Sequence, residues 1–164
     1  MTAVYVAAGS NVEPIANLRR AIGALAAHYP GLRVSQAWRN RAVGFEGDDF
    51  VNLAVGFETG DDLRTVLGRL HEAEAICGRA RNAPKWAPRS MDLDILLYGD
   101  VVCDEPGLTL PRPDLLRRAY MLGPMAELAP GLVHPVERGT MAELWSRFDR
   151  DAHPMQPVEL GWSP

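Results

Sequence analysis

The sequence has little cysteine and no long apolar run. Cys77 and Cys103 are its only two cysteines, and their spacing fits no metal-binding motif. Two reduced thiols of this kind are typical of a cytoplasmic protein. The first residues carry no basic segment ahead of an apolar one, and no stretch is long enough to cross a bilayer, so we expect neither a signal peptide nor a membrane span.

Positive charge is also scarce. The formal net charge of −4 argues against general nucleic-acid binding, which usually requires a basic surface. The chain contains neither Gly-x-x-x-x-Gly-Lys-Ser/Thr nor Gly-x-Gly-x-x-Gly, so the common phosphate-binding loops are excluded.

The length of 164 residues suits one domain with its own core. We expect this domain over residues 1–150. Residues 151–164 hold three prolines and little apolar pattern, which predicts a surface tail. We expect the chain to act as a monomer.

Apolar periodicity predicts the order strand–helix–strand–strand–helix–strand. This is the order of the ferredoxin-like α+β plait, in which two helices cover one face of an antiparallel sheet. The other face is then free, and we expect the ligand site there. The expected strands are 3–8, 32–38, 50–59 and 91–98, and the expected helices are 14–28 and 62–77.

The C-terminal third predicts shorter, mainly helical elements. Residues 101–103 are expected to pair with the strand at 91–98 as a hairpin, and 108–110 to form a short strand. Residues 114–128 read as mostly helical, with Pro124 interrupting or delimiting the helix. A last short helix is expected at 141–148.

Two carboxylates stand two residues apart in the strand expected at 91–98. Side chains at i and i+2 of a strand point to the same face, about 6–7 Å apart, so Asp92 and Asp94 share a face. Leu93, Ile95 and Leu97 then point into the core. Because like charges side by side destabilise a sheet, a divalent metal ion is the expected partner of the two carboxylates.

A basic segment leads directly into this strand. Residues 79–89 carry four basic side chains and no acidic one. Such a loop beside two carboxylates indicates a polyphosphate site, where Arg and Lys contact phosphate oxygens and the carboxylates hold Mg²⁺. A solvated surface loop is the simpler alternative. Because the basic cluster is local, we expect a small anion as its ligand.

The strand expected at 50–59 adds an amide to the same surface. Its apolar row faces the core, and Asn52 lies on the opposite side with Phe50. If this strand and the strand at 91–98 belong to one sheet, Asn52 shares a face with Asp92 and Asp94.

Short segments spread over nearly the whole chain resemble one enzyme family, the hydroxymethyl-dihydropterin pyrophosphokinases of folate biosynthesis. The most specific is the Pro88-Arg89-Ser90-Met91-Asp92-Leu93-Asp94 block. The other matching segments are Gly9-Ser10-Asn11, Val43-Gly44, Asp49-Phe50-Val51-Asn52, Leu108-Thr109-Leu110-Pro111, Arg118-Ala119-Tyr120-Met121-Leu122 and Glu127-Leu128-Ala129-Pro130.

The resemblance implies transfer of a diphosphate from ATP to the hydroxymethyl group of 6-hydroxymethyl-7,8-dihydropterin, with release of AMP and use of two Mg²⁺ ions. The pterin hydroxyl would attack the β-phosphorus in line, so the protein mainly positions the substrates and neutralises charge. We see no compelling dedicated general base in the sequence.

The resemblance also assigns residues to the site. Tyr120 and Trp86 can stack on the flat pterin, and Asn52 offers its edge both a donor and an acceptor. The implied catalytic residues are Arg79, Arg81, Arg89, Asp92 and Asp94; the metal ligands are Asp92 and Asp94. The nucleotide site comprises His71, Glu74, Arg81, Lys85, Trp86, Arg89, Ile95, Leu108, Thr109, Arg112 and Arg118, and the pterin site Asn40, Val43, Phe50, Asn52, Trp86, Asp92 and Tyr120.

Some positions depart from the family pattern. Asn40-Arg41-Ala42 replaces a Thr-x-Pro type of sequence, Arg112 stands where a His is frequent, and Gly107 stands where an Arg is frequent. A non-catalytic or altered-substrate nucleotide-binding homologue is therefore the alternative function. An RNA-binding plait is a third possibility, which the carboxylates on the open face argue against. Trp86, Phe50 and Tyr120 could also be packing residues.

Overall fold

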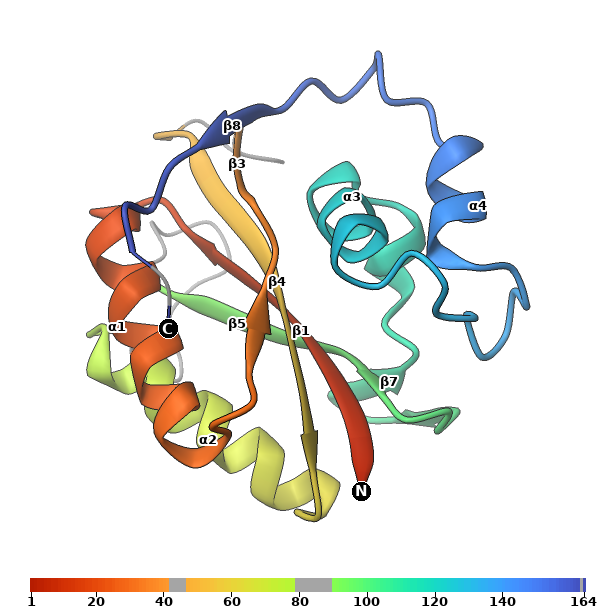
Figure 1. Cartoon of the computed structure of the whole chain (residues 1–164), viewed down its shortest axis with the longest axis horizontal. Coiled ribbons are helices and arrows are strands. Elements are labelled where there is room, and N and C mark those ends of the chain that lie inside the picture. Colours follow the sequence, from red (N-terminus) through yellow and green to blue (C-terminus); the bar gives the residue numbers. More distant parts are fainter. Residues whose placement is uncertain (42–46, 79–89, 163) are drawn as a thin grey trace.

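The structure is a computed structural model that describes residues 1–41, 47–78, 90–162 and 164. Its main sheet has β1 (Thr2–Ser10) at the centre, between β4 (Phe50–Thr59) and β5 (Asp92–Tyr98). The strand order is β5-β1-β4-β3-β8, with every pairing antiparallel; β3 spans Ala37–Asn40 and β8 spans Gln156–Val158 (Figure 1). This is the ferredoxin-like order with one added edge strand, so the predicted fold class is confirmed.

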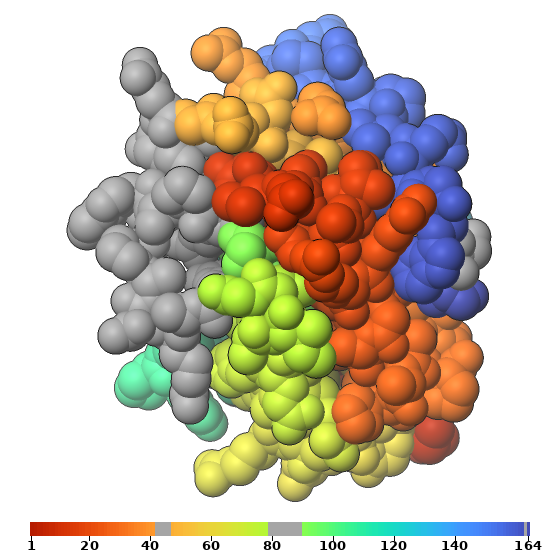
Figure 2. Space-filling view, turned by 90° about the vertical axis from the view of Figure 1, so that its left-hand side faces the viewer, coloured from red at the N-terminus to blue at the C-terminus, as the bar shows by residue number. Residues whose placement is uncertain are grey.

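Two helices cover one face of the sheet, as expected. Pro14 opens α1 (Pro14–His28), at a position where its missing N–H is not needed. The side chain of Asp62 caps α2 (Leu63–Ile76) by accepting a hydrogen bond from the Thr65 N–H at 2.8 Å. Figure 2 shows the two helices side by side on this face. The core beneath them includes Val4, Val6, Leu18, Ile22, Leu25, Leu53, Val55, Val66, Leu70, Leu93 and Ile95.

The opposite face is covered over part of its length. The 3₁₀ helix η1 (Pro113–Leu116), α3 (Ala119–Leu128) and α4 (Met141–Ser146) lie on this side (Figure 1). Met121, Leu122 and Met125 of α3 share a second core with Tyr5 and Ala54 of the sheet. The prediction of a free face is therefore wrong for this part, because apolar side chains on it need cover.

A β-bulge changes the orientation of side chains in β5. Tyr5 of β1 pairs with Leu97, but the next residue, Val6, pairs with Ile95. Leu96 is therefore an extra residue, and the strict alternation ends there. Leu97 lies in the second core and not with Leu93 and Ile95, which corrects the prediction for Leu97.

The strand predicted at 32–38 is two strands. β2 (Arg33–Val34) pairs with one part of β4 and β3 with another. Ser35 lies between them, where its backbone N–H donates to Ala54 O and its side-chain oxygen accepts from Ala54 N, each at 2.9 Å. A side chain thus replaces a backbone partner at this point of the ladder.

The hairpin predicted between 91–98 and 101–103 is wrong. β6 (Cys103–Glu105) instead pairs with β7 (Leu108–Leu110), which confirms a short strand at 108–110. The helical region predicted at 114–128 divides into η1 and α3, and Pro124 lies inside α3.

The segment 151–164 is mostly exposed but contributes to the sheet. β8 (Gln156–Val158) pairs with β3. Leu160 is 9% exposed, and its carbonyl accepts a hydrogen bond from the Arg19 guanidinium on α1, with Nε at 2.9 Å. In the part of the chain that the structure describes, no helix is long and apolar enough to span a membrane.

Candidate active site at one end of the central strands

Three paired residues, one from each of three neighbouring strands, form a row across the site. Gly9 of β1 pairs with Asn52 of β4 on one side and with Asp92 of β5 on the other. Paired residues of antiparallel strands point to the same face, so the amide and the carboxylate flank a glycine. The next row in the same direction is Ala54, Ala7 and Asp94. The alternation argument thus correctly placed Asn52, Asp92 and Asp94 on one surface.

Gly9 leaves the space that Asn52 occupies. A Cβ built on Gly9 would overlap the side-chain oxygen of Asn52 and come within 3.8 Å of the Phe50 ring. Any other residue at position 9 would therefore move the Asn52 amide. Sequence reasoning noted Gly9 only as part of a matching segment, although a glycine at the end of a buried strand is itself a signal of close approach.

Asn52 is held by Asn40, which the family resemblance also assigns to the pterin site. Its amide nitrogen donates to the side-chain oxygen of Asn40 in β3, and Asn40 pairs with Phe50 in the strand register. Asn52 is 6% exposed, so this hydrogen bond fixes its orientation in a nearly dry environment. The structure therefore brings Asn40, Phe50 and Asn52 together.

The two carboxylates of β5 are half-buried, with a cation beside them. Arg112 Nη2 lies 3.4 Å from Asp94 Oδ1. A guanidinium at this distance compensates one of the like charges that the sequence placed on this strand. The structure thus brings together the aspartate pair and Arg112, one of the positions that departs from the family pattern.

The start of α3 adds an aromatic ring next to the carboxylates. Tyr120 is half-buried, and burial raises the pKa of its phenol. Arg118 opposes this shift, whereas Asp114, Asp94 and Asp92 add to it. Tyr120 packs against the second core, which includes Ala7 and Ala54 of the row that ends at Asp94, and the raised pKa keeps its hydroxyl neutral.

Glu74 supports the strand that carries the carboxylates. Its Oε2 accepts a hydrogen bond from the backbone N–H of Leu93 at 2.8 Å, from α2 to the edge strand β5. This contact holds the backbone between Asp92 and Asp94. Glu74 therefore has a positioning role in addition to the nucleotide contact that the sequence predicts.

The remaining nucleotide-site predictions fall in different environments. The side chain of Ile95 is buried in the main core, so only its backbone is available to a ligand. Thr109 is half-buried, and its hydroxyl donates to Asp104 Oδ1 at 2.9 Å. His71 is exposed on α2, while Leu108 and Arg118 are half-buried.

Several predictions lie outside the described residues: Val43, Arg79, Arg81, Lys85, Trp86 and Arg89. Within residues 1–41, 47–78, 90–162 and 164, no group of three or more His, Cys, Asp or Glu side chains is placed to hold a metal ion. Two carboxylates on one face of a strand suit Mg²⁺, which usually keeps water and substrate phosphate ligands.

Ser10 and Asn11, which follow Gly9 in the chain, form hydrogen bonds to the segments that precede β5 and β4. The Ser10 hydroxyl donates to Ser90 O at 2.7 Å, and Asn11 Nδ2 donates to Asp48 O at 3.3 Å. These bonds fix the segments that enter β4 and β5 against the end of β1. Sequence reasoning assigned no role to either residue, although polar side chains at a strand end are a usable signal.

Comparison with known proteins gives a consistent result. A model of the 7,8-dihydro-6-hydroxymethylpterin-pyrophosphokinase family matches residues 5–130. The 2-amino-4-hydroxy-6-hydroxymethyldihydropteridine pyrophosphokinase of Synechocystis is 36% identical over 96% of this chain and 83% of its own length. The enzyme of that name from Methylorubrum extorquens is 37% identical, over 91% of this chain and 95% of its own.

Solved structures show the same fold. A crystal structure of an HPPK-DHPS in complex with substrates matches 88% of this chain with a TM-score of 0.68 at 10% identity. Plasmodium falciparum HPPK-DHPS with pterin and p-hydroxybenzoate matches 89% with a TM-score of 0.66 at 13% identity. This chain spans 43% of each of those longer chains. The family match over most of its length shows that the chain belongs to the 7,8-dihydro-6-hydroxymethylpterin-pyrophosphokinase family.

Proposed function

We propose that the protein transfers a diphosphate from ATP to the hydroxymethyl group of 6-hydroxymethyl-7,8-dihydropterin. The oxygen of the pterin hydroxyl bonds to the β-phosphorus, the bond from this phosphorus to the α,β-bridging oxygen breaks, and AMP leaves. The hydroxyl proton passes to solvent. The observation that carries this proposal is the Asn52–Gly9–Asp92 row in a member of this family. The row puts an amide, which can hydrogen-bond to the edge of a pterin, on the same face as a carboxylate.

The pterin is proposed to bind at the Asn52 end of the row. Asn52 reads the hydrogen-bonding edge of the heterocycle, and its bond to Asn40 keeps the amide in one orientation. Tyr120 supplies an aromatic face for stacking. Trp86 as a second face and Val43 as a further contact remain predictions.

The ATP phosphates are proposed to bind at the Asp92 and Asp94 end. Asp92 and Asp94 would hold Mg²⁺, which when bound neutralises phosphate charge and links the phosphates to the protein. Arg112, whose guanidinium lies 3.4 Å from Asp94, is proposed to contact a phosphate oxygen as charge develops on the leaving group. The stoichiometry of two Mg²⁺ ions and the roles of Arg79, Arg81, Lys85 and Arg89 are predictions from the family resemblance.

The decisive experiment measures the nucleotide product. The purified chain is incubated with ATP, MgCl₂ and 6-hydroxymethyl-7,8-dihydropterin, and the products are separated by anion-exchange chromatography. We expect AMP and a pterin diphosphate in equal amounts, with none formed when the pterin is omitted. ADP in place of AMP would overturn diphosphate transfer, and ATP binding without any turnover would favour the non-catalytic homologue.

A further inference from the structure

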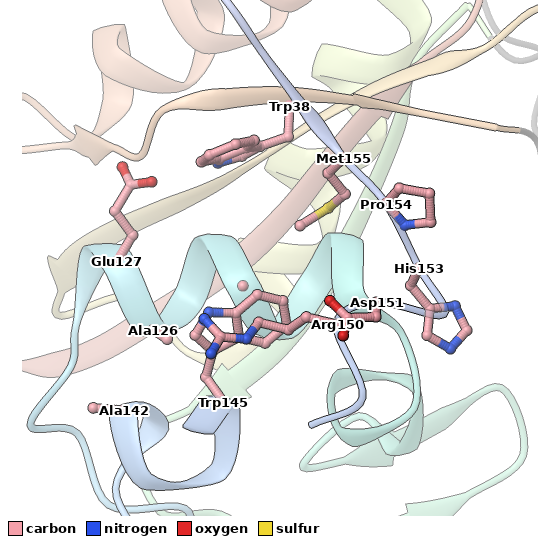
Figure 3. A pocket seen from close by; sticks show the side chains of 11 residues that line it. Trp38, Ala126, Glu127, Ala142, Trp145, Arg150, Asp151, His153, Pro154 and Met155 are labelled. Atoms are coloured by element: carbon pink, nitrogen blue, oxygen red, sulfur yellow. The ribbon is translucent and has the colours of Figure 1, made fainter. Parts of the chain in front are cut away.

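A cleft lies on the same side of the sheet as α3 and α4, apart from the Asn52–Gly9–Asp92 row. It has a volume of about 620 Å³ and is bounded by β3, α3, α4 and the segment 150–155 (Figure 3). A volume of several hundred Å³ is typical of small-molecule sites. Its described lining residues include none of those assigned above to ATP, pterin or metal, so it is a separate site.

The walls of this cleft are two indole rings and a thioether. Trp38 of β3 and Trp145 of α4 lie on different sides, with Met155 between them in the view of Figure 3. Gly123 of α3 makes this arrangement possible: a Cβ there would come within 3.0 Å of Trp145 Cη2 and 3.1 Å of Met155 Cε. A glycine inside a helix costs roughly 1 kcal/mol relative to alanine, and here it lets the ring lie against the helix backbone.

The Trp145 ring already holds a cation. The guanidinium carbon of Arg150 lies 5.4 Å from the ring centroid, within the range of a cation–π contact. Phe148 also stacks on Trp145, with 5.5 Å between the ring centroids. The ring is thus anchored, and a ligand can reach its electron-rich face only by displacing the Arg150 guanidinium.

Two carboxylates lie at the ends of the cleft. Glu127 is next to Trp38, and Asp151 is next to Arg150 in Figure 3. Glu127 is held in place because its Oε2 accepts the backbone N–H of Gln36 at 2.6 Å. The two negative charges exceed the single guanidinium, so the cleft favours a ligand that is flat and positively charged.

We propose that this cleft binds a small aromatic organic cation. The ring of the ligand takes the place of the Arg150 guanidinium on the Trp145 face, and its ammonium group pairs with a carboxylate at the end of the cleft. Arg150 is the internal competitor, because its guanidinium occupies the face of Trp145 and adds a like charge. The cleft is linked to the Asn52–Gly9–Asp92 row through the sheet, because Trp38 pairs with Asn52 in the strand register. This inference does not depend on the proposed reaction.

The test compares two ligands that share a ring and differ in charge. Tryptamine and indole-3-acetate are titrated separately into the ¹⁵N-labelled full chain, and the indole N–H signals are followed by NMR. We expect tryptamine to shift the Trp38 and Trp145 signals with a Kd of about 1 mM or lower, a reasonable affinity for a ligand of this size. Indole-3-acetate should bind at least about tenfold more weakly.

Variants identify the charges responsible. Glu127→Gln with Asp151→Asn should weaken tryptamine about tenfold, and the glutamine oxygen can still accept from Gln36. Asp100→Asn with Glu105→Gln is the matched control, because both acids are exposed and remote from the cleft lining. Arg150→Gln should tighten binding. Equal affinity for the two ligands, an unchanged affinity in the first variant, or shifts confined to other tryptophans would each overturn the proposal.

Discussion

At the scale of single residues, the missing side chain of Gly9 matters to the site as much as the side chains around it. Gly9 contributes no side chain, and this absence gives Asn52 its place. Asp92 and Asp94 contribute charge that the fold alone does not require. The two aspartates could be predicted from the sequence because they interrupt an apolar strand. The need for a glycine at position 9 could not, because it depends on which residue pairs with Gly9 across the sheet.

The first prediction concerns Asp94. Replacing Asp94 with Ala should lower turnover roughly 100-fold or more, because the proposed Mg²⁺ ligand and the partner of Arg112 are lost. The fold should survive, since Asp94 is 22% and Arg112 34% exposed, so water can hydrate the Arg112 guanidinium once its partner is removed. The measurement is kcat for AMP release together with the thermal midpoint. Asp100→Ala is the control, and near-normal turnover of Asp94→Ala at limiting Mg²⁺ would contradict the assignment.

The second prediction concerns Gly9. Gly9→Ala should raise the KM for the pterin roughly tenfold while the KM for ATP changes little, because the added methyl displaces the Asn52 amide. Gly68 on α2 has open space around it, so Gly68→Ala is the matched control.

A double-variant cycle tests whether Gly9 acts through Asn52. In an Asn52→Ala background the alanine at position 9 has nothing to displace, so its effect on the pterin KM should largely disappear. An effect that persists unchanged in that background, or a parallel rise in the ATP KM, would show that Gly9 acts in another way.

At the scale of elements, the short contacts between helix ends and strands decide where the site residues stand. α2 begins at the Asp62 cap, and near its other end Glu74 holds the Leu93 N–H. The helix therefore fixes β5 relative to the rest of the sheet. Hydrophobic periodicity predicted α2 well, but not this contact, because a carboxylate that accepts a backbone N–H looks like any exposed acid in a sequence.

Glu74 yields the third prediction, which separates positioning from binding. Glu74→Gln keeps an acceptor for the Leu93 N–H and should retain most activity, whereas Glu74→Ala removes it and should lower kcat by roughly tenfold. Hydrogen exchange of the Leu93 amide provides an independent readout and should be faster only in the alanine variant. Equal activity of the two variants would mean that the contact does not position β5.

The fourth prediction is a pH dependence at the start of α2. Hydrogen bonds from Thr65 lower the pKa of Asp62 below its ordinary value of 3.8. A carboxyl whose pKa is lower in the folded state stabilises the protein above its unfolded pKa and loses this effect as the pH falls through the folded pKa. Asp62→Ala should therefore melt at a lower temperature than the wild type at neutral pH, and the difference should narrow below pH 3.8. A difference that is constant between neutral and acid pH would contradict this origin.

The irregularities inside the strands could not be predicted from the sequence. The bulge at Leu96 carries no glycine or proline, and the interruption at Ser35 depends on its partner Ala54 in another strand. Both are set by pairing between distant segments and not by local propensity. The predicted pairing of residues 101–103 with the strand at 91–98 was wrong for the same reason.

At the scale of the whole molecule, the order of elements was predictable because the two helices and four main strands have clear periods. The cover on the second face was not, since α3 is apolar on several sides and its packing partner is a sheet face that also carries the site. One sheet face thus carries both the second core and the side chains of Asn52, Asp92 and Asp94, and the sequence alone does not show where one ends and the other begins.

The fifth prediction concerns the C-terminal segment. Leu160→Ala should lower the free energy of unfolding by about 2 kcal/mol, because Leu160 is almost buried against the main core at its margin. Turnover at 25 °C should remain near normal, since the site lies at the other strands. Urea unfolding measures the first and AMP release the second. Pro164→Ala is an exposed control, and a Leu160→Ala protein with unchanged stability would show that the segment is only loosely attached.

The added strand β8 also determines how the sheet ends. An exposed edge strand offers its backbone groups to strands of other molecules, which is a route to aggregation. Here the outermost strand has only three residues and contains Pro157, which has no N–H to donate. At the other edge, Glu74 accepts the Leu93 N–H and the Arg112 N–H donates to Leu96 O at 3.0 Å. Both margins of the sheet are thus blunted against strand addition, and at the β5 edge this is done by contacts that also hold the strand carrying Asp92 and Asp94 in place.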